Sequence, residues 1–479
     1  MRAAKSWPAS AMAVLALALS ITGCGGDGDG DDDLDQPGLI AGGGANGGAI
    51  KGKLAVFVID EDTDAPLAGA TVRAGINASA TPTAMGTTDA TGGVALSADA
   101  LTGKQTVTVI ASGYAPTTWV GVNAANLTIP VRSKTPPAAS PSGTVMATIA
   151  GWDTLPMPAT NHFTAGIVVA SDDPDHDTVG ITQGTRTVSG LPMPIPANIC
   201  IKGMVQATAI SDCNLSVKTR TGKLALLAFI VDRDNRGTAS DADDVSVVTG
   251  YAVVTGLDVA SGATMGGVML SLIPATDTTS LGITLAAPPA PLTTSRAVPI
   301  LDLGGASAGG RFSLGFVLAD AAMPTSLVPK LVGPLSAAHY DVTAQALAPA
   351  PSNVTSLAFQ RNISLGAGVN VTSWLAPPTQ LTANPGTLSF GFTAATGATV
   401  HAMNISAQSG NVWRLTFFDG TTAVTLPALS PDPFPAGGAP LRLDASAIDV
   451  PGLNLQRFSS KTAADTVARI ASDELPFTR

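Results

Sequence analysis

Short stretches in which hydrophobic and polar residues alternate recur along the chain, separated by turns rich in Gly, Asp and Asn. Residues 51–60 (KGKLAVFVID) form the first such stretch, and others follow at 87–97, 104–122 and 126–131. A period of two with many Val, Ile, Thr and aromatic residues is typical of strands with one buried face. Runs such as KLALLAFIVD and VSVVTGYAVV continue the pattern after residue 144. The sequence therefore predicts an all-β fold of several β-sandwich domains in tandem.

Proline-rich segments interrupt this pattern and predict the domain boundaries. The segment SKTPPAASPSG is predicted to be a semi-rigid linker, because closely spaced prolines favour an extended backbone. Over residues 461–475 the apolar positions are three and four apart, which predicts a short helix near the end of the chain. The predicted order is a sandwich at 50–132, the linker at 133–143, one or two sandwiches at 144–375, another sandwich at 376–457 and a tail at 458–479.

Three motifs in the first predicted sandwich carry a resemblance to a known family. They are PLAGATV at 66–72, TDATG at 88–92 and VTVIASGY at 107–114. Together they resemble the carboxypeptidase regulatory-like domain, a transthyretin-like sandwich of about seven strands. The resemblance implies a structural or presenting module without catalytic residues of its own. The segment after residue 376 more loosely resembles a fibronectin type III-like sandwich.

The same motifs make local predictions. Gly69 and Gly92 lie at turns where a positive φ is wanted, and glycine adopts such a backbone without steric cost. Tyr114 is predicted to pack its ring under the edge of the sheet.

The N-terminus has the pattern of an export signal. Basic residues precede the apolar run AMAVLALALSI at 11–21, which is too short to span a hydrocarbon core of about 30 Å. The run ends in ITGC at 21–24, which resembles the lipobox of bacterial lipoproteins. The resemblance implies a signal peptide over 1–23, lipidation of Cys24 and anchoring in a bacterial cell envelope. Gly25 directly after the cysteine implies the outer membrane.

Composition and charge indicate which parts of the chain fold and which partners are disfavoured. Residues 24–49 carry six Asp among many Gly and are predicted to be a disordered tether, because like charges and glycine resist collapse. Hydrophobic residues make up 45% of the 479 residues and charged residues 13%, so the rest of the chain has enough apolar material for a folded core. A formal net charge of −10 with scattered Lys and Arg disfavours nucleic acid as a partner.

Cysteine usage fits an exported protein. With Cys24 lipidated, Cys200 and Cys213 are left, and an oxidising compartment should join them in a disulfide. Closing this short loop stabilises the fold by roughly 3 kcal/mol in the chain-entropy model. A metal or redox pair is disfavoured, because there is no CxxC spacing and no neighbouring His.

Two acidic loops are candidate calcium sites. Both follow predicted strands and bring several carboxylates into one short segment, and Ca²⁺ prefers such hard oxygen ligands. Arg236 in the second loop occupies a place where an oxygen ligand is usual, so solvated turns with Arg–Asp pairing are the alternative interpretation. The candidate ligands are Asp172, Asp173 and Asp175 in the first loop, and Asp232, Asp234, Asp241 and Asp243 in the second.

A GASAG segment at 305–309 matches the GxSxG pattern of a serine hydrolase, with Ser307 as the nucleophile. The following residues alternate like a strand rather than a helix, so we interpret the match as coincidental. The four histidines show neither HxH nor HExxH spacing, which disfavours a zinc enzyme.

The sequence thus predicts a non-catalytic, lipid-anchored envelope protein whose β-sandwich modules provide structural support or bind envelope proteins or glycans. No cofactor is expected, apart from calcium in the acidic loops. The alternative is a calcium-stabilised adhesin or carbohydrate-binding lipoprotein, and a more distant alternative is a secreted serine hydrolase.

Overall fold

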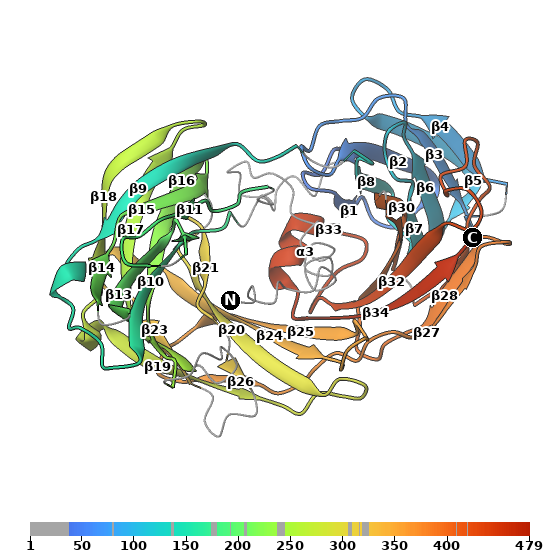
Figure 1. Cartoon of the computed structure of the whole chain (residues 1–479). Coiled ribbons are helices and arrows are strands. Elements are labelled where there is room, and N and C mark those ends of the chain that lie inside the picture. The colour runs from blue at the N-terminus through green and yellow to red at the C-terminus, as the bar shows by residue number, and fades with distance from the viewer. Residues whose placement is uncertain are drawn as a thin grey trace.

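The computed structural model of the chain describes residues 38–78, 81–135, 138–173, 180–191, 193–205, 208–236, 245–304, 309–315, 317–318, 325–408, 410–418 and 420–479. Two lobes are joined by a long curved sheet (Figure 1). Within the described residues one α-helix occurs, α3 (Ser460–Thr466), with three single 3₁₀ turns at η2 (Trp152–Thr154), η3 (Ala275–Asp277) and η4 (Gly333–Leu335). The predicted all-β fold of several packed sheets is confirmed.

The first sandwich packs two sheets face to face. Val56 on one sheet and Val107 on the other are fully buried in the shared core, since alternate residues of each strand point inward. β2, β5 and β8 belong to one sheet, and β3, β4, β6 and β7 to the other. The strands are β2 (Lys51–Asp60), β3 (Thr71–Gly75), β4 (Ala84–Thr87), β5 (Gly93–Thr102), β6 (Gln105–Ile110), β7 (Thr117–Val122) and β8 (Asn126–Val131).

The predicted turn glycines have the expected backbone. Gly69 has φ 78° and Gly92 has φ 74°. A Cβ at Gly92 would lie 2.7 Å from the carbonyl oxygen of Val58, so the turn also needs the missing side chain. Tyr114 packs against the core of this sandwich, and its hydroxyl donates a 2.7 Å hydrogen bond to Asp60 Oδ2. These local predictions are confirmed.

The chain is already part of this sandwich before residue 50. β1 (Gly44–Asn46) pairs antiparallel with β8 on one side and with β33 (Phe458–Ser459) on the other. Ala45 and Ile50 are buried. The tether predicted over 24–49 is therefore too long, because residues from 38 onward fold onto the body; its earlier part lies outside the described residues. Apolar positions among the glycines decide this, since they gain a core to pack against.

The second lobe is formed by an eight-stranded sheet in the order β14-β13-β10-β16-β17-β18-β9-β15. Its longest strands, β16 and β17, pair with each other along most of their length. A two-stranded pair, β11 (Thr185–Arg186) with β12 (Ile195–Pro196), lies beside it. The eight strands are β9 (Ser142–Ile149), β10 (His162–Ala170), β13 (Ile199–Val205), β14 (Thr208–Asp212), β15 (Leu215–Arg220), β16 (Gly222–Asp234), β17 (Val245–Val259) and β18 (Thr264–Leu272).

β16 is buried on both faces. Leu224 and Leu226 point into the core inside the eight-stranded sheet. Ala225 and Leu227 point into a second core on the opposite face. This explains why the sequence of β16 is a nearly continuous apolar run rather than an alternating one. The strand thus connects two cores within the region between residues 144 and 375.

The second core is closed by strands from two further sheets. A small sheet of β19 (Thr278–Leu285), β23 (Thr325–Pro329) and β26 (Val369–Val371) lies on one side. The other side is one end of the long curved sheet, formed by β20 (Thr294–Asp302), β21 (Arg311–Ser313), β22 (Val317–Leu318), β24 (His339–Leu347) and β25 (Thr355–Ile363). The segment between Thr278 and Val371 thus packs under β16 and β17.

The C-terminal region forms an aromatic-rich core. Trp413 and Phe417 of β30 are fully buried there together with Phe390 of β28. A three-stranded sheet, β27 (Thr379–Asn384), β28 (Ser389–Thr393) and β31 (Ala423–Thr425), covers the longer strands β29 (Val400–Ala407), β30 (Gly410–Phe417) and β32 (Pro440–Asp449).

The end of the chain is mainly a strand. The helix predicted over 461–475 is shorter than the apolar spacing suggests: α3 ends at Thr466, and β34 (Arg469–Thr478) follows. β34 lies between β25 and β32 and pairs with β32 over ten register positions. Ladder hydrogen bonds with two neighbours satisfy more backbone groups than a short exposed helix would.

One sheet of thirteen strands extends from the first sandwich through the C-terminal region to the strands that pack under the second lobe (Figure 1). Its order is β21-β20-β24-β25-β34-β32-β29-β30-β7-β6-β3-β4, with β22 beside β20. The first sandwich joins the C-terminal region where β7 pairs in parallel with β30. At this junction Trp413 Nε1 donates a 3.0 Å hydrogen bond to Thr118 Oγ1, and Arg414 forms an ion pair with the buried Glu61. The first sandwich is therefore fused to the C-terminal region.

Candidate functional site

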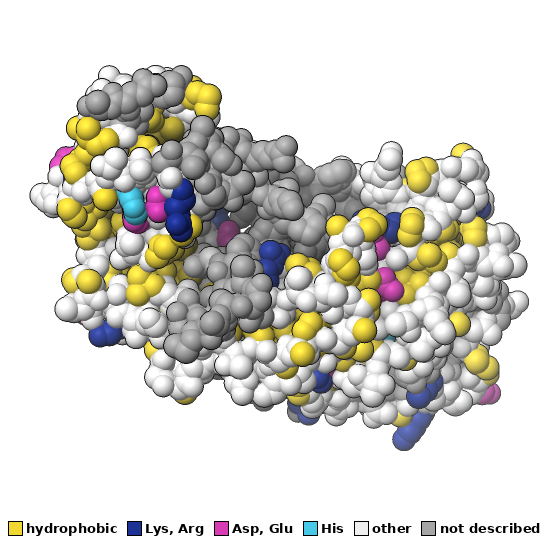
Figure 2. Space-filling view, turned by 60° about the horizontal axis from the view of Figure 1, so that its bottom comes forward, with side chains coloured by type: hydrophobic (Ala, Val, Ile, Leu, Met, Phe, Trp, Pro, Cys, Tyr) yellow, Lys and Arg dark blue, Asp and Glu magenta, His cyan; other side chains and the backbone are white. Residues whose placement is uncertain are grey.

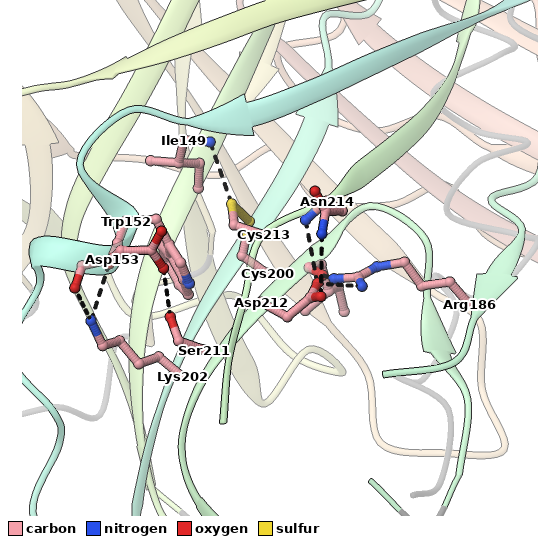
Figure 3. The surroundings of a disulfide bond; sticks show 11 residues. Ile149, Trp152, Asp153, Arg186, Cys200, Lys202, Ser211, Asp212, Cys213 and Asn214 are labelled. Atoms are coloured by element: carbon pink, nitrogen blue, oxygen red, sulfur yellow. Dashed lines mark hydrogen bonds and ion pairs between the residues drawn. A yellow bond between two sulfur atoms is a disulfide. The ribbon is translucent and has the colours of Figure 1, made fainter. Parts of the chain in front are cut away.

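The predicted disulfide is present and joins β13 to the loop between β14 and β15 in the second lobe (Figure 3). Cys200 lies on β13, and Cys213 lies between β14 and β15; both are buried. The backbone N–H of Ile149 donates to Cys213 Sγ at 3.3 Å. Beside it, the buried Lys202 donates to the carbonyl oxygens of Trp152 and Asp153, which satisfies its ammonium group without a carboxylate. The bond therefore fastens β13 to the loop that leads into β15.

Several predicted site residues lie outside the described residues. These are Cys24, Asp175, Asp241, Asp243 and Ser307. In the part of the chain that is described, no helix is long and apolar enough to cross a membrane.

Asp232 and Asp234 lie at the end of β16 and face a histidine on β10. His162 Nδ1 is 2.9 Å from Asp232 Oδ2, and His162 Nε2 is 3.9 Å from Asp234 Oδ1. Arg236 Nε is 3.3 Å from the other oxygen of Asp234. Both carboxylates are thus in contact with ionisable nitrogen groups of the chain itself, and all four side chains are partly exposed. Arg–Asp pairing, the alternative interpretation from the sequence, is present at Asp234.

The other acidic loop lies at the opposite end of β10. Thr164 on β10 is opposite Asp232, and Asp172 follows eight residues later, which corresponds to roughly 26 Å along a strand. Asp173 contacts Arg220, whose Nη1 is 3.8 Å from Asp173 Oδ2. Among the described ligands of the two loops, Asp172 and Asp232 therefore lie too far apart to share one ion.

Asp172 ends a row of charged residues across neighbouring strands. Register pairing places Asp172 opposite Arg311, Arg311 opposite Asp302, and Asp302 opposite His339. Residues directly opposite each other in antiparallel strands project to the same face, so the four side chains share one face. Asp341 lies two residues after His339 on β24 and faces the same way. The row lies where the second lobe meets the long sheet.

The centre of this row is a group of three possible metal ligands. Ligand atoms of Asp302, His339 and Asp341 all lie within 4.8 Å of one another. His339 Nε2 is 3.7 Å from Asp302 Oδ2 and 3.7 Å from Asp341 Oδ1. Asp302 is almost fully buried; Arg311 forms an ion pair with its Oδ2, and the N–H of Gly304 donates to its Oδ1 at 2.7 Å.

Sequence reasoning missed this group. His339 is part of no HxH or HExxH motif, and neither Asp302 nor Asp341 lies in an acidic run. The available signal was the His339-Tyr340-Asp341 segment, because a strand places residues i and i+2 on one face. Asp302 could not be added without knowing that β20 pairs with β24.

A second polar group lies in the middle of the long sheet. Asp444 of β32 is opposite Asn404 of β29 and opposite Glu474 of β34. Arg442 contacts both acids, with Nε 2.9 Å from Asp444 Oδ1 and Nη1 3.7 Å from Glu474 Oε2. Burial raises the pKa of Asp444 to about 6, although Arg442 acts in the opposite direction. Asn404 Oδ1 is buried without a hydrogen-bond partner among the described residues.

Comparisons with known proteins find similarity only to solved structures, and with low scores. No family model matches the sequence, and no characterised protein matches it. The Bacillus anthracis TIE protein is similar over 68% of this chain and 50% of its own, with 10% identity and a TM-score of 0.13. The shaft pilin SpaA from Lactobacillus rhamnosus GG is similar over 47% of this chain and 98% of its own, with 13% identity and a TM-score of 0.14.

A streptococcal ancillary pilin is similar over 67% of this chain and 97% of its own, with 9% identity and a TM-score of 0.13. The chain thus covers half the length of the TIE protein and nearly all of the two pilins. Scores this low carry no argument about function, and the resemblance of residues 50–132 to the carboxypeptidase regulatory-like family stays a prediction.

Proposed function

We propose that the protein is a lipid-anchored envelope protein that presents fixed β-sandwich surfaces to envelope proteins or glycans and does not catalyse a reaction. The observation that carries this proposal is the continuity of the thirteen-stranded sheet, which joins the first sandwich, the C-terminal region and the sheet end next to the second lobe. Such a body holds its outer faces in fixed relative orientation, which suits presentation of a binding surface. Lipidation of Cys24 would attach it to the outer membrane.

Exposed apolar side chains on the second lobe support a partner-binding role. Met146 on β9 and Met269 on β18 are 42% and 58% exposed, on adjacent parallel strands. Their neighbours Val145 and Val268 are buried, so both methionines point to the solvent side. Flexible, polarisable methionines suit adaptable binding surfaces. On the face shown in Figure 2, charged side chains are few, and hydrophobic side chains lie among uncharged polar ones.

The anchor is tested by replacing Cys24 with Ala in the full chain. Wild-type protein is expected to fractionate with outer membranes and to incorporate labelled palmitate, whereas Cys24→Ala should appear in the soluble periplasmic fraction without label. The Cys200→Ala/Cys213→Ala variant is the control, since it removes two cysteines but keeps the lipobox. Palmitate on Cys24→Ala, or membrane retention of that variant, contradicts the anchor.

Partner binding is tested with the Cys24→Ala chain and isolated envelopes. The soluble chain is expected to sediment with envelopes, and Met146→Ser/Met269→Ser should reduce the bound fraction while leaving thermal unfolding unchanged.

A labelled serine-directed phosphonate is the parallel test for catalysis. We expect no labelling, and labelling that disappears in Ser307→Ala would replace this proposal with a hydrolase.

The acidic loops support a second proposal, a calcium-stabilised adhesin or carbohydrate-binding lipoprotein. The observation in its favour is that Asp232 and Asp234 lie two residues apart on one strand and therefore face the same side, next to the remaining acidic segment. Calcium binding there predicts a melting temperature that rises with calcium and falls with chelator. The rise should disappear in Asp232→Asn/Asp234→Asn, and no rise at millimolar calcium rejects this alternative.

A further inference from the structure

We propose that Asp302, His339 and Asp341 bind one divalent transition-metal ion, with Zn²⁺ as the expected ion. The site lies at the end of β20 and the start of β24, on the face of the long sheet opposite to the core residues Leu301 and Tyr340. It does not include the predicted calcium ligands Asp232 and Asp234.

The distances in this group fit a shared ion better than direct hydrogen bonds. A ring nitrogen that donates to a carboxylate normally lies within about 3.2 Å of the oxygen. Both contacts of His339 Nε2 are 3.7 Å, so this nitrogen is hydrogen-bonded to neither aspartate. Two ligands each about 2.1 Å from a tetrahedral zinc ion are about 3.4 Å apart. Each His–Asp pair therefore needs to close by only a few tenths of an ångström around the ion.

The backbone holds these ligands in place. Asp302 and His339 are directly opposite each other in the antiparallel β20–β24 pair, and Asp341 shares the face of His339 on the same strand. The N–H of Asn362 donates to Asp341 Oδ1 at 3.0 Å, and the N–H of Gly304 donates to Asp302 Oδ1. Hydrogen bonds of this kind orient carboxylates in metal sites. The ligand set thus comes from strands whose separation the sheet already fixes.

Exposure and charge allow an ion to enter. The side chain of Asp302 is 2% exposed and that of Asp341 is 13% exposed, while His339 at 37% forms the solvent side of the group. A solvent-facing fourth position is therefore available for water, as in zinc sites with three protein ligands. Arg311 is the competing cation, because it pairs with Asp302 Oδ2, the same oxygen that lies 3.7 Å from His339 Nε2, so the metal must share this oxygen with Arg311 or displace Arg311 from it.

The ligand types select the ion. An imidazole nitrogen with two carboxylate oxygens suits Zn²⁺ and its neighbours in the first transition row. Ca²⁺ prefers six to eight oxygen ligands, and this group supplies too few. The site is thus distinguishable from a calcium loop by the metal alone.

Isothermal titration of the full lipidated chain in detergent with ZnCl₂ tests the proposal. We expect one zinc ion to bind per chain. The zinc affinity should fall at least about tenfold in both His339→Ala and Asp341→Asn. Any heat released by CaCl₂ should be the same in the wild type and in His339→Ala. His162→Ala is the matched control, since His162 also lies between two aspartates but in a pair close enough for a direct hydrogen bond. This variant should bind zinc like the wild type.

Titration with Co²⁺ adds a readout of the ligands themselves, because a tetrahedral cobalt site has visible absorption bands that the His339→Ala variant should lose. Thermal unfolding without metal checks that each variant is folded, and Asp341→Asn keeps the shape of the side chain if His339→Ala does not fold. The proposal is overturned if the wild type binds no zinc, if zinc binding persists unchanged in both site variants, or if His162→Ala removes it.

Discussion

The junction between the first sandwich and the C-terminal region gives the sharpest test of the fold. Glu61 and Arg414 form an ion pair there, with side chains 5% and 17% exposed. Glu61 Oε1 is buried without a hydrogen-bond partner among the described residues, so the carboxylate depends on Arg414 for its compensation. Removing one partner of a buried pair leaves an uncompensated charge and costs about 3–5 kcal/mol. Arg414→Met is therefore expected to destabilise the protein by this amount.

The expected shift is large enough for calorimetry. For a cooperative unit of about 150–250 residues, such as the first sandwich together with the C-terminal region, a change of 1 kcal/mol in unfolding free energy moves the melting temperature by about 2–4 °C. A loss of 3–5 kcal/mol then corresponds to about 6–20 °C. The double variant Arg414→Met/Glu61→Gln should recover most of the loss, because no buried charge is left without a partner. Asp432→Asn is the control: its partner Arg479 and Asp432 itself are both partly exposed, and a surface pair contributes about 0–1 kcal/mol.

The double-mutant cycle also reports on the fusion of the two parts. If the first sandwich and the C-terminal region unfold as one unit, Arg414→Met lowers a single transition that includes both. The losses of unfolding free energy in Arg414→Met alone and in Glu61→Gln alone should not add up to the loss in the double variant. Additivity within about 0.5 kcal/mol refutes the reasoning, since independent sites behave in that way. A first sandwich that melts separately, unaffected by Arg414→Met, would refute it as well.

Three further predictions concern other parts of the body. The Cys200→Ala/Cys213→Ala variant should lose roughly 3 kcal/mol of unfolding free energy, and reducing agent should lower the melting temperature of the wild type but not of this variant. Burial raises the pKa of Asp444 to about 6, so the folded state binds the proton of this carboxyl more tightly than the unfolded state does. The group therefore stabilises the fold below about pH 4, and this contribution is lost as the pH rises to about 6. Stability measured from pH 4 to 7 should therefore fall more in the wild type than in Asp444→Asn, and parallel curves would contradict the shift. Gly44→Ala should lower the melting temperature more than Gly48→Ala, although both glycines have a positive φ. A Cβ at Gly44 would lie 2.2 Å from the carbonyl oxygen of Phe458, whereas a Cβ at Gly48 would have nothing within 4 Å. Equal effects would argue against the pairing of β1 with β33.

The all-β class was predictable because period-two alternation is a local property of the chain. Burial of β16 on both faces also left a local signal, since its apolar run KLALLAFIV hardly alternates. The fusion of β7 with β30 left none: Thr118 and Trp413 are 295 residues apart, and either strand edge could have been solvated or paired elsewhere. Pairing across such separations depends on the whole packing arrangement rather than on local preference.

The candidate metal ligands also differ in whether a local sequence pattern could have identified them. The spacing of His339 and Asp341 places them on one face once the segment is known to be a strand. Asp302 joins them only through the register of β20 against β24, which no short motif encodes. The acidic loops were conspicuous in the sequence because charge runs are visible there, yet the described aspartates Asp232 and Asp234 have His and Arg as neighbours.

The position of β1 determines how a pulling force would enter the body. This strand has hydrogen-bonded neighbours on both sides, β8 from the first sandwich and β33 from the C-terminal region. Tension applied along the chain ahead of residue 38 would act along the axis of β1 and load both ladders in shear at once, so that their bonds must break together rather than one after another. At this strand the load would also be divided between two parts that are distant in sequence. A body attached in this way would resist peeling from its own N-terminal strand and would move as one piece when a bound partner is pulled away from the cell.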